Sequence, residues 1–236
     1  MKLIDFVKLD TKSLISILGV KKMIIIGIIL CALPIISDIS EKVPFPLSLV
    51  IFGLILFILC LLVNEGLFSI ETKNHINEFY ITQNIPRKTV VYGRYLSNLI
   101  LTFIVTVASF IIEVAILIAM GKLSDIKMGI AITAVLFIGI FLTCEIYSVI
   151  SFPIYYAFGF SKGRYISSFF VTALFIAFTF IYISYTVKNP IDPSTVSPET
   201  VLMTIISITL IALGVLVLLS YFSLHLSRIF YSKKEF

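Results

Sequence analysis

The chain of 236 residues has no tryptophan, two histidines and three cysteines, and only 13% of its residues are charged. Soluble domains carry about 25% charged residues, so the composition argues against a water-soluble fold. His75 and His225 stand alone without metal-ligand spacing, which gives no reason to expect a metal site. Cys31, Cys60 and Cys144 lie in apolar stretches without CxxC spacing, and we interpret them as small buried hydrophobic residues.

The sequence also lacks a nucleotide-binding loop. Such a loop follows the pattern G-x-x-x-x-G-K-[ST] after a strand, whereas the one Gly–Lys pair, Gly121–Lys122, precedes Leu123. No nucleophile and base stand in a catalytic arrangement. We therefore expect that the chain is not an enzyme, that it carries no cofactor, and that any ATP and Mg²⁺ bind to a separate partner subunit.

Long apolar runs dominate what is present, and the mean hydropathy is +1.12. Most of these runs approach the roughly 20 residues that cross a hydrocarbon core of about 30 Å. The six runs are Met23–Ile36, Pro46–Val63, Leu99–Met120, Met128–Ser148, Ile166–Val187 and Val201–Leu224. They predict an all-α polytopic membrane protein with six transmembrane helices, forming a single transmembrane domain over residues 1–236.

The basic residues are sorted to one side of this predicted topology. Six spans place fourteen of them with the two termini and loops 64–98 and 149–165, and four on the other side. Without the short first span, the split becomes nine to nine. The positive-inside rule therefore predicts six spans and a multi-pass cell-membrane protein with both termini in the cytoplasm. The net charge of +5 follows from this topology and from contact with anionic membrane lipid rather than nucleic acid.

Two segments on the predicted cytoplasmic side carry structural signals. Residues 1–20 alternate apolar residues with lysines and aspartates, which predicts an amphipathic helix in the inner headgroup region. In the 64–98 segment, Pro86 suits the first turn of a helix that continues through Tyr92 into the third span. A short helix around residues 74–81, with exposed aromatic and charged side chains, would suit docking of another protein, although a solvated hairpin is equally compatible.

The second cytoplasmic loop is tighter than the first. Pro153 is expected to kink or end the fourth span. Gly159 and Gly163 allow a sharp turn, and Lys162 and Arg164 would anchor that turn at the inner headgroups.

The two loops resemble a known family. The run NEFYITQNIPRKTVVYGRYLSN is similar to the "LPISRKEIVLGKYL" signature of short ABC-2 type transporter permeases. The positions that match it are Pro86, Arg87, Lys88, Val91, Gly93, Arg94, Tyr95 and Leu96. Asn84 and Ile85 replace the usual small-residue–Leu pair. The second loop resembles a further family pattern through Pro153, Tyr156, Phe158, Gly159, Lys162, Gly163 and Arg164.

The resemblance implies a function and partners. Such permeases pair with a second permease copy, either identical or paralogous, and each copy docks an ATPase subunit through the loop between spans two and three. The residues that would couple to the ATPase here are Glu71, Lys73, Asn77, Glu78, Phe79, Tyr80, Pro86, Arg87 and Lys88. The family exports amphipathic or hydrophobic peptides, drugs and lipids. The likeness is greatest to permeases that export phenol-soluble modulins from low-GC Gram-positive bacteria.

Two carboxylates fall inside predicted spans. Glu113 lies in the outer half of the third span and Glu145 in the inner half of the fourth. A charge there costs about 2.5–3.5 kcal/mol on insertion scales, so each should face a cavity or a partner, or be protonated. Both can be read as the polar wall of a translocation path, together with Phe175 and Phe178 of the aromatic fifth span, or as interhelical hydrogen-bonding groups.

Three classes of function compete on these observations. The first is the permease subunit of an ATP-driven exporter. The second is an ion-coupled secondary transporter that uses Glu113 or Glu145 as its proton site, although no inverted repeat is apparent. The third is an intramembrane enzyme, for which the sequence offers no catalytic pair.

The six-span topology is tested by reporter fusions. A reporter at Phe236 is expected in the cytoplasm and one within loop 188–200 on the outer side, because the basic asymmetry puts the C-terminus in the cytoplasm and the span Val201–Leu224 separates the two positions. Signals from the same side would contradict the topology.

Overall fold

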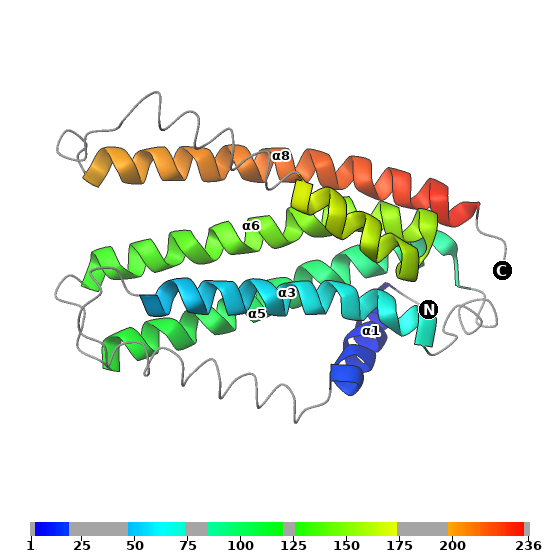
Figure 1. Cartoon of the computed structure of the whole chain (residues 1–236), viewed down its shortest axis with the longest axis horizontal. Helices are drawn as coiled ribbons and strands as arrows, with labels where there is room; N and C mark the ends of the chain where they lie inside the picture. The colour runs from blue at the N-terminus through cyan, green and yellow to red at the C-terminus, as the bar shows by residue number, and fades with distance from the viewer. Residues whose placement is uncertain (1–2, 19–46, 74–84, 120–125, 174–197, 234–236) are drawn as a thin grey trace. The chain divides into compact units, whose positions relative to one another are not determined.

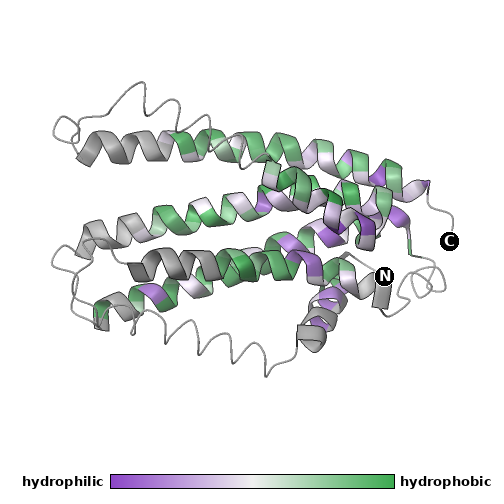
Figure 2. Cartoon of the chain, viewed as in Figure 1, coloured by the Kyte–Doolittle hydropathy of each residue, from purple (hydrophilic) through white to green (hydrophobic). Residues whose placement is uncertain are grey.

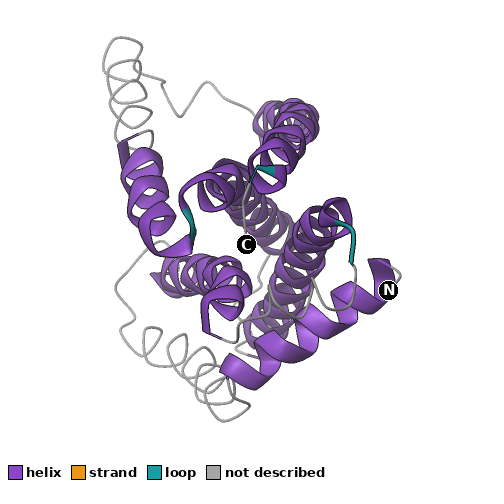
Figure 3. Ribbon diagram, turned by 90° about the vertical axis from the view of Figure 1, so that its right-hand side faces the viewer, coloured by secondary structure: helices purple, strands orange, loops and turns teal. Residues whose placement is uncertain are grey.

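The computed structural model describes residues 3–18, 47–73, 85–119, 126–173 and 198–233, and every element in these ranges is a helix (Figures 1 and 3). The named helices are α1 (Leu3–Leu18), α3 (Leu47–Lys73), α5 (Arg87–Ala119), α6 (Ile126–Phe158) and α8 (Pro198–Ser232). Residues 160–173 form a further helix. The all-α prediction is confirmed for these residues. The first predicted span and most of the fifth lie outside them.

Three of the described helices are long and apolar enough to cross a membrane. The qualifying segments are Arg87–Ala115 in α5, Thr133–Phe158 in α6 and Ser207–Ser232 in α8. The shorter segment Leu56–Ser69 of α3 is also apolar. Figure 2 shows mostly hydrophobic residues along these helices and a larger share of hydrophilic positions on α1. The fold is therefore that of a polytopic membrane protein, and the total of six spans stays a prediction.

The helices extend well beyond the apolar runs that predicted them. Helix α3 continues from Val63 to Lys73, and α5 begins at Arg87 rather than near Leu99. The Pro86 carbonyl accepts a bond from the Thr89 amide at 2.8 Å, so the predicted helix start at this proline is confirmed. With 33 residues, α5 is about 50 Å long, which exceeds a hydrocarbon core of about 30 Å.

The described residues form two compact units, the first ending at Ser148 and the second running from Val149 to Lys233. In the first unit, α1 packs against α3 and α5, and α3 packs against α5 (Figure 1). Helix α5 also runs antiparallel to α6. Phe103 faces Phe141 and Phe110 faces Phe137, so rising residue numbers on α5 meet falling numbers on α6.

The apolar core of the first unit lies between α3, α5 and α6. Its fully buried members are Leu56, Cys60, Phe137 and Cys144. Cys60 and Cys144 are free thiols in this core, which confirms their interpretation as buried apolar residues. Cys31 lies outside the described residues.

The second unit contains the end of α6, the helix at residues 160–173, and α8. Pro153 does not end the helix, because α6 continues through it to Phe158. The turn comes at Gly159, whose φ of 78° is a left-handed conformation that favours glycine. Gly163 lies against the Tyr155 ring, where an added Cβ would come within 2.9 Å of a ring carbon. The two glycines therefore make the turn, as the sequence predicts.

Side-chain contacts hold α8 against α6 within the second unit. The Tyr156 and Tyr231 rings lie 5.1 Å apart between centroids. The Ser223 hydroxyl donates a hydrogen bond to the Val149 carbonyl. The Tyr155 ring meets Phe160 edge-on at 5.5 Å, which joins the end of α6 to the helix that follows it.

Candidate functional site

Arg94 joins three helices at one end of the first unit, where α3 ends and α5 begins. This is called the α1 end below. The Arg94 guanidinium lies 3.2 Å from the Asp10 carboxylate of α1, and both side chains are fully buried. Arg94 also donates a hydrogen bond to the Leu67 carbonyl of α3. Removing one partner of such a buried pair typically costs about 3–5 kcal/mol, because the other charge is left unpaired.

An aromatic contact reinforces the same junction. The Arg94 guanidinium lies over the Phe6 ring of α1, 5.8 Å from its centroid, within the range of a cation–π interaction. Phe6 is fully buried and packs directly on Gly93, where an added Cβ would overlap its ring. The Gly–Arg step of α5 therefore has a structural explanation. The glycine admits the ring, and the arginine pairs with the acid four residues farther along α1.

A buried polar network lies one turn deeper along α3 and α5. The side-chain amides of Asn64 and Asn98 both donate to the Ser148 hydroxyl, at 2.7 and 2.9 Å. Ser148 in turn donates to the Cys144 carbonyl at 2.9 Å. The Asn98 amide also lies 3.4 Å from a Glu145 carboxylate oxygen. Hydrogen bonds thus join polar groups of three helices at a level buried away from water.

Glu113 occupies the opposite end of the α5–α6 interface. It is 1% exposed, and the antiparallel pairing places it near the level of Thr133, which is also buried. Fifteen residues separate Glu113 from Asn98 along α5, a distance of about 22 Å at 1.5 Å per residue. Since Asn98 contacts Glu145, the two carboxylates do not form one pair.

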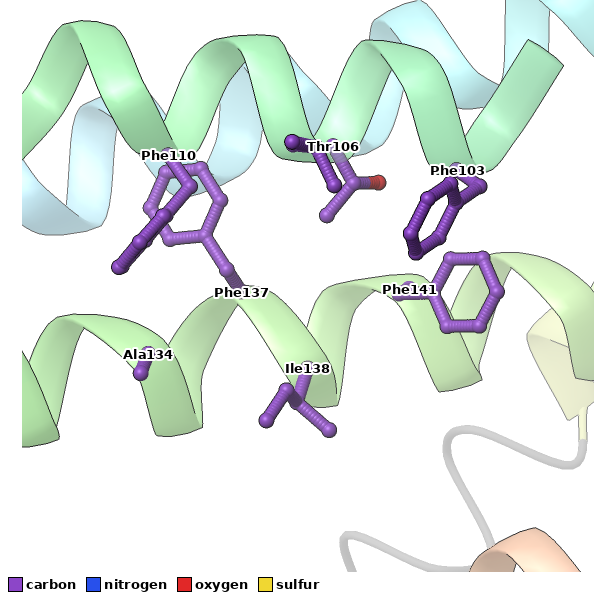
Figure 4. A pocket seen from close by; sticks show the side chains of 8 residues that line it. Phe103, Thr106, Phe110, Ala134, Phe137, Ile138 and Phe141 are labelled. Carbon is purple, nitrogen blue, oxygen red and sulfur yellow. The ribbon is translucent and has the colours of Figure 1, made fainter. Parts of the chain in front are cut away.

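An apolar pocket lies between these two polar levels (Figure 4). Its volume is about 240 Å³. Phe103 and Phe141 meet edge-on at 6.2 Å across it, as do Phe110 and Phe137 at 5.6 Å. The residues that line it are Phe103, Thr106, Val107, Phe110, Ala134, Phe137, Ile138 and Phe141.

Thr106 adds little polarity to this pocket. Its hydroxyl is bonded to the Thr102 carbonyl of its own helix at 2.8 Å. The pocket is also smaller than the roughly 300–1,000 Å³ of sites that enclose whole small molecules. It therefore fits an apolar side chain or a length of acyl chain from a larger molecule.

The residues predicted to couple to an ATPase are only partly described. Pro86, Arg87 and Lys88 are exposed at the start of α5. Glu71 and Lys73 belong to the last turn of α3, although their side chains are not among those described. The predicted residues Asn77, Glu78, Phe79 and Tyr80, and the path residues Phe175 and Phe178, lie outside the described ranges.

Sequence reasoning missed the residues that hold the α1 end together. Asp10, Asn64, Asn98 and Ser148 were not singled out, and Arg94 entered only through the family signature. Asn64 and Asn98 border apolar runs, so hydropathy alone assigns them to a loop. The available signal was the spacing of Phe6 and Asp10, four residues apart on one helix face.

The described residues contain no group of three or more His, Cys, Asp or Glu side chains that could hold a metal ion. Hydrogen-bonding groups and apolar rings make up the site instead. It can hold helices in register and contact an apolar or amphipathic molecule.

Long apolar helices joined by buried polar contacts define a helical membrane protein. The profile of the family described as ABC-2 family transporter protein matches residues 8–227. The chain belongs to this family, and it is therefore a membrane subunit of an ABC transporter, a class that works with an ATPase subunit. No curated protein and no solved structure matches the chain.

The polar network is tested by removing its central hydroxyl. Ser148→Ala removes an acceptor shared by two buried amides, of which only Asn98 keeps a second contact, at 3.4 Å to Glu145, and it should lower the free energy of unfolding by roughly 1–3 kcal/mol. Thr143→Ala is the matched control. Thr143 also bonds the carbonyl four residues earlier on α6, yet it is exposed. Thermal unfolding in detergent measures both variants, and equal midpoints would contradict the role of the network.

Proposed function

We propose that the chain is the permease subunit of an ATP-driven exporter that moves an amphipathic or hydrophobic molecule outward, with ATP hydrolysed by a separate subunit. The observation that carries the substrate class is the apolar pocket between α5 and α6, lined by two facing pairs of phenylalanines. Such a wall offers few groups to replace the hydration shell of an ion or a sugar. It suits an acyl chain or apolar side chains.

Glu113 supplies the polar complement to this pocket. It follows Phe110 by three residues on α5, so the two side chains project from the same helix face. A buried carboxylate one turn from an aromatic pocket suits a cargo with an amine or lysine beside its apolar part. We assign Glu145 differently, because its contact with Asn98 joins α5 and α6 at the polar network.

The proposed path also involves parts of the chain beyond the described residues. It runs along the interface of two permease copies and is lined partly by the second and fifth spans, with Phe175 and Phe178 of the aromatic fifth span in its wall. Amphipathic peptides of the phenol-soluble-modulin type are the cargo that combines these features best. Membership of the ABC-2 family favours this mechanism over an ion-coupled secondary transporter.

Co-purification tests the partnership with an ATPase. The chain, expressed with an ATPase encoded beside it, should retain that subunit in detergent, and a cationic amphipathic peptide should stimulate its ATP hydrolysis. Glu78→Ala combined with Phe79→Ala should abolish the stimulation, because we place the coupling contact in this segment, while membrane insertion stays normal. Glu41→Ala in the predicted first outer loop is the control. Stimulation that survives the double substitution would contradict this assignment.

Glu113→Gln tests the carboxylate at the pocket. The substitution keeps the size of the side chain and its hydrogen bonding but removes its charge, so export of a cationic amphipathic peptide should fall by roughly tenfold, equivalent to about 1.4 kcal/mol. Export of a neutral analogue by the same variant is the control. Unchanged export together with a lower unfolding temperature would instead identify Glu113 as a packing residue.

A further inference from the structure

Arg94 is the point at which α1, α3 and α5 are joined. It pairs with Asp10 of α1 at 3.2 Å, bonds the Leu67 carbonyl of α3, and covers the Phe6 ring of α1. Asp10, Arg94 and Phe6 are fully buried. Since Arg94 belongs to α5, one side chain connects all three helices without exposure to solvent.

The position of Arg94 relates it to the segment between α3 and α5. Leu67 lies six residues before the end of α3, and Arg94 lies seven residues after the start of α5. These distances are about 9 and 10 Å along the helices at 1.5 Å per residue. Arg94 therefore links the helix that leads into residues 74–86 with the helix that leads out, close to where both meet that segment.

We propose that Arg94 is a positioning residue for coupling, which holds α1, α3 and α5 as one rigid body so that force applied between α3 and α5 moves all three. The proposal rests on the function proposed above, in which the ATPase docks on the segment between these helices. Arg94 touches neither nucleotide nor cargo in this scheme, and its effect passes through the helices that it joins.

Arginine is the residue type that this junction requires. Its Nη1 donates to the Leu67 carbonyl and lies 3.2 Å from the Asp10 carboxylate, and the planar guanidinium also lies over an aromatic ring. A lysine ammonium is a compact charge without that planar geometry. If α1 moved away from α5, a buried guanidinium and a buried carboxylate would both lose their partner, which keeps the three helices together.

The opposite face of α1 supplies a matched control. Lys8 and Lys12 are exposed, and they lie across the helix from Phe6 and Asp10. The double substitution Lys8→Gln and Lys12→Gln alters the charge of α1 without touching the junction. An effect common to the whole helix would appear in this variant, whereas an effect of the Arg94 junction would not.

The experiment measures how the permease activates its ATPase. The permease is reconstituted in lipid nanodiscs, the adjacent ATPase subunit is titrated onto it, and ATP hydrolysis is recorded with no cargo added. The titration yields two quantities, the apparent affinity for the ATPase and the maximal permease-dependent rate. A role confined to folding or docking alters the affinity or the amount of folded complex, whereas a coupling role lowers the maximal rate of a complex that still forms.

Asp10→Asn and Arg94→Lys are expected to lower the maximal permease-dependent rate at least roughly fivefold, with the affinity for the ATPase unchanged. The lysine control should behave as the wild type. If Asp10→Asn does not fold, the variant that combines it with Arg94→Gln decides, since it leaves no unpaired buried charge. A lowered maximal rate in this double variant supports the proposal, and a wild-type rate overturns it.

The remaining outcomes separate this proposal from the function on which it rests. Junction variants with a wild-type maximal rate, or with a loss of affinity alone, overturn the positioning role and leave the proposed function intact. An equal loss in the lysine control also overturns it. A wild-type permease that neither binds nor activates the ATPase overturns the proposed function, and the positioning role with it.

Discussion

A polar group buried away from water must find its partner inside the protein, and this constraint organises the first unit. Asp10 of α1 and Arg94 of α5 form a buried ion pair, and Arg94 also donates a hydrogen bond to the Leu67 carbonyl of α3. One turn deeper, the Ser148 hydroxyl of α6 accepts hydrogen bonds from the side-chain amides of Asn64 on α3 and Asn98 on α5. Apolar burial between helices gains little where lipid is equally apolar, so these polar contacts add to side-chain packing in joining the helices.

The general character of the fold follows from the sequence because it depends on local properties. Apolar runs locate α3, α5, α6 and α8, Pro86 marks the start of α5, and Gly159 marks the turn after α6. The family also follows, since its signature is contiguous in the chain. Hydropathy nevertheless ends α3, α6 and α8 too early and starts α5 too late, because the polar residues at these helix ends resemble a loop.

Contacts between distant residues account for what the sequence did not reveal. Nothing local to Asp10 indicates that its partner is Arg94, and nothing local to Asn64 indicates that it meets Ser148 of α6. The pocket could not be predicted from the sequence either. Its facing phenylalanines come from two helices, and they lie opposite each other only because α5 and α6 pack in an antiparallel register. The intramembrane carboxylates were recognised from sequence, but their separation into different environments required the packing of α5 against α6.

The junction at Arg94 also bears on how the chain is assembled during synthesis. Helix α1 leaves the ribosome well before α5, and at roughly 5–20 residues per second the Asp10 carboxylate waits several seconds for its partner. Burial of the Phe6 ring is delayed in the same way, because Gly93, against which the ring packs, has not yet been synthesised. Closure of α1 onto the bundle can therefore occur only after α3 and α5 are both in place. Helix α1 is therefore made before α3 and α5 but reaches its final contacts only after both.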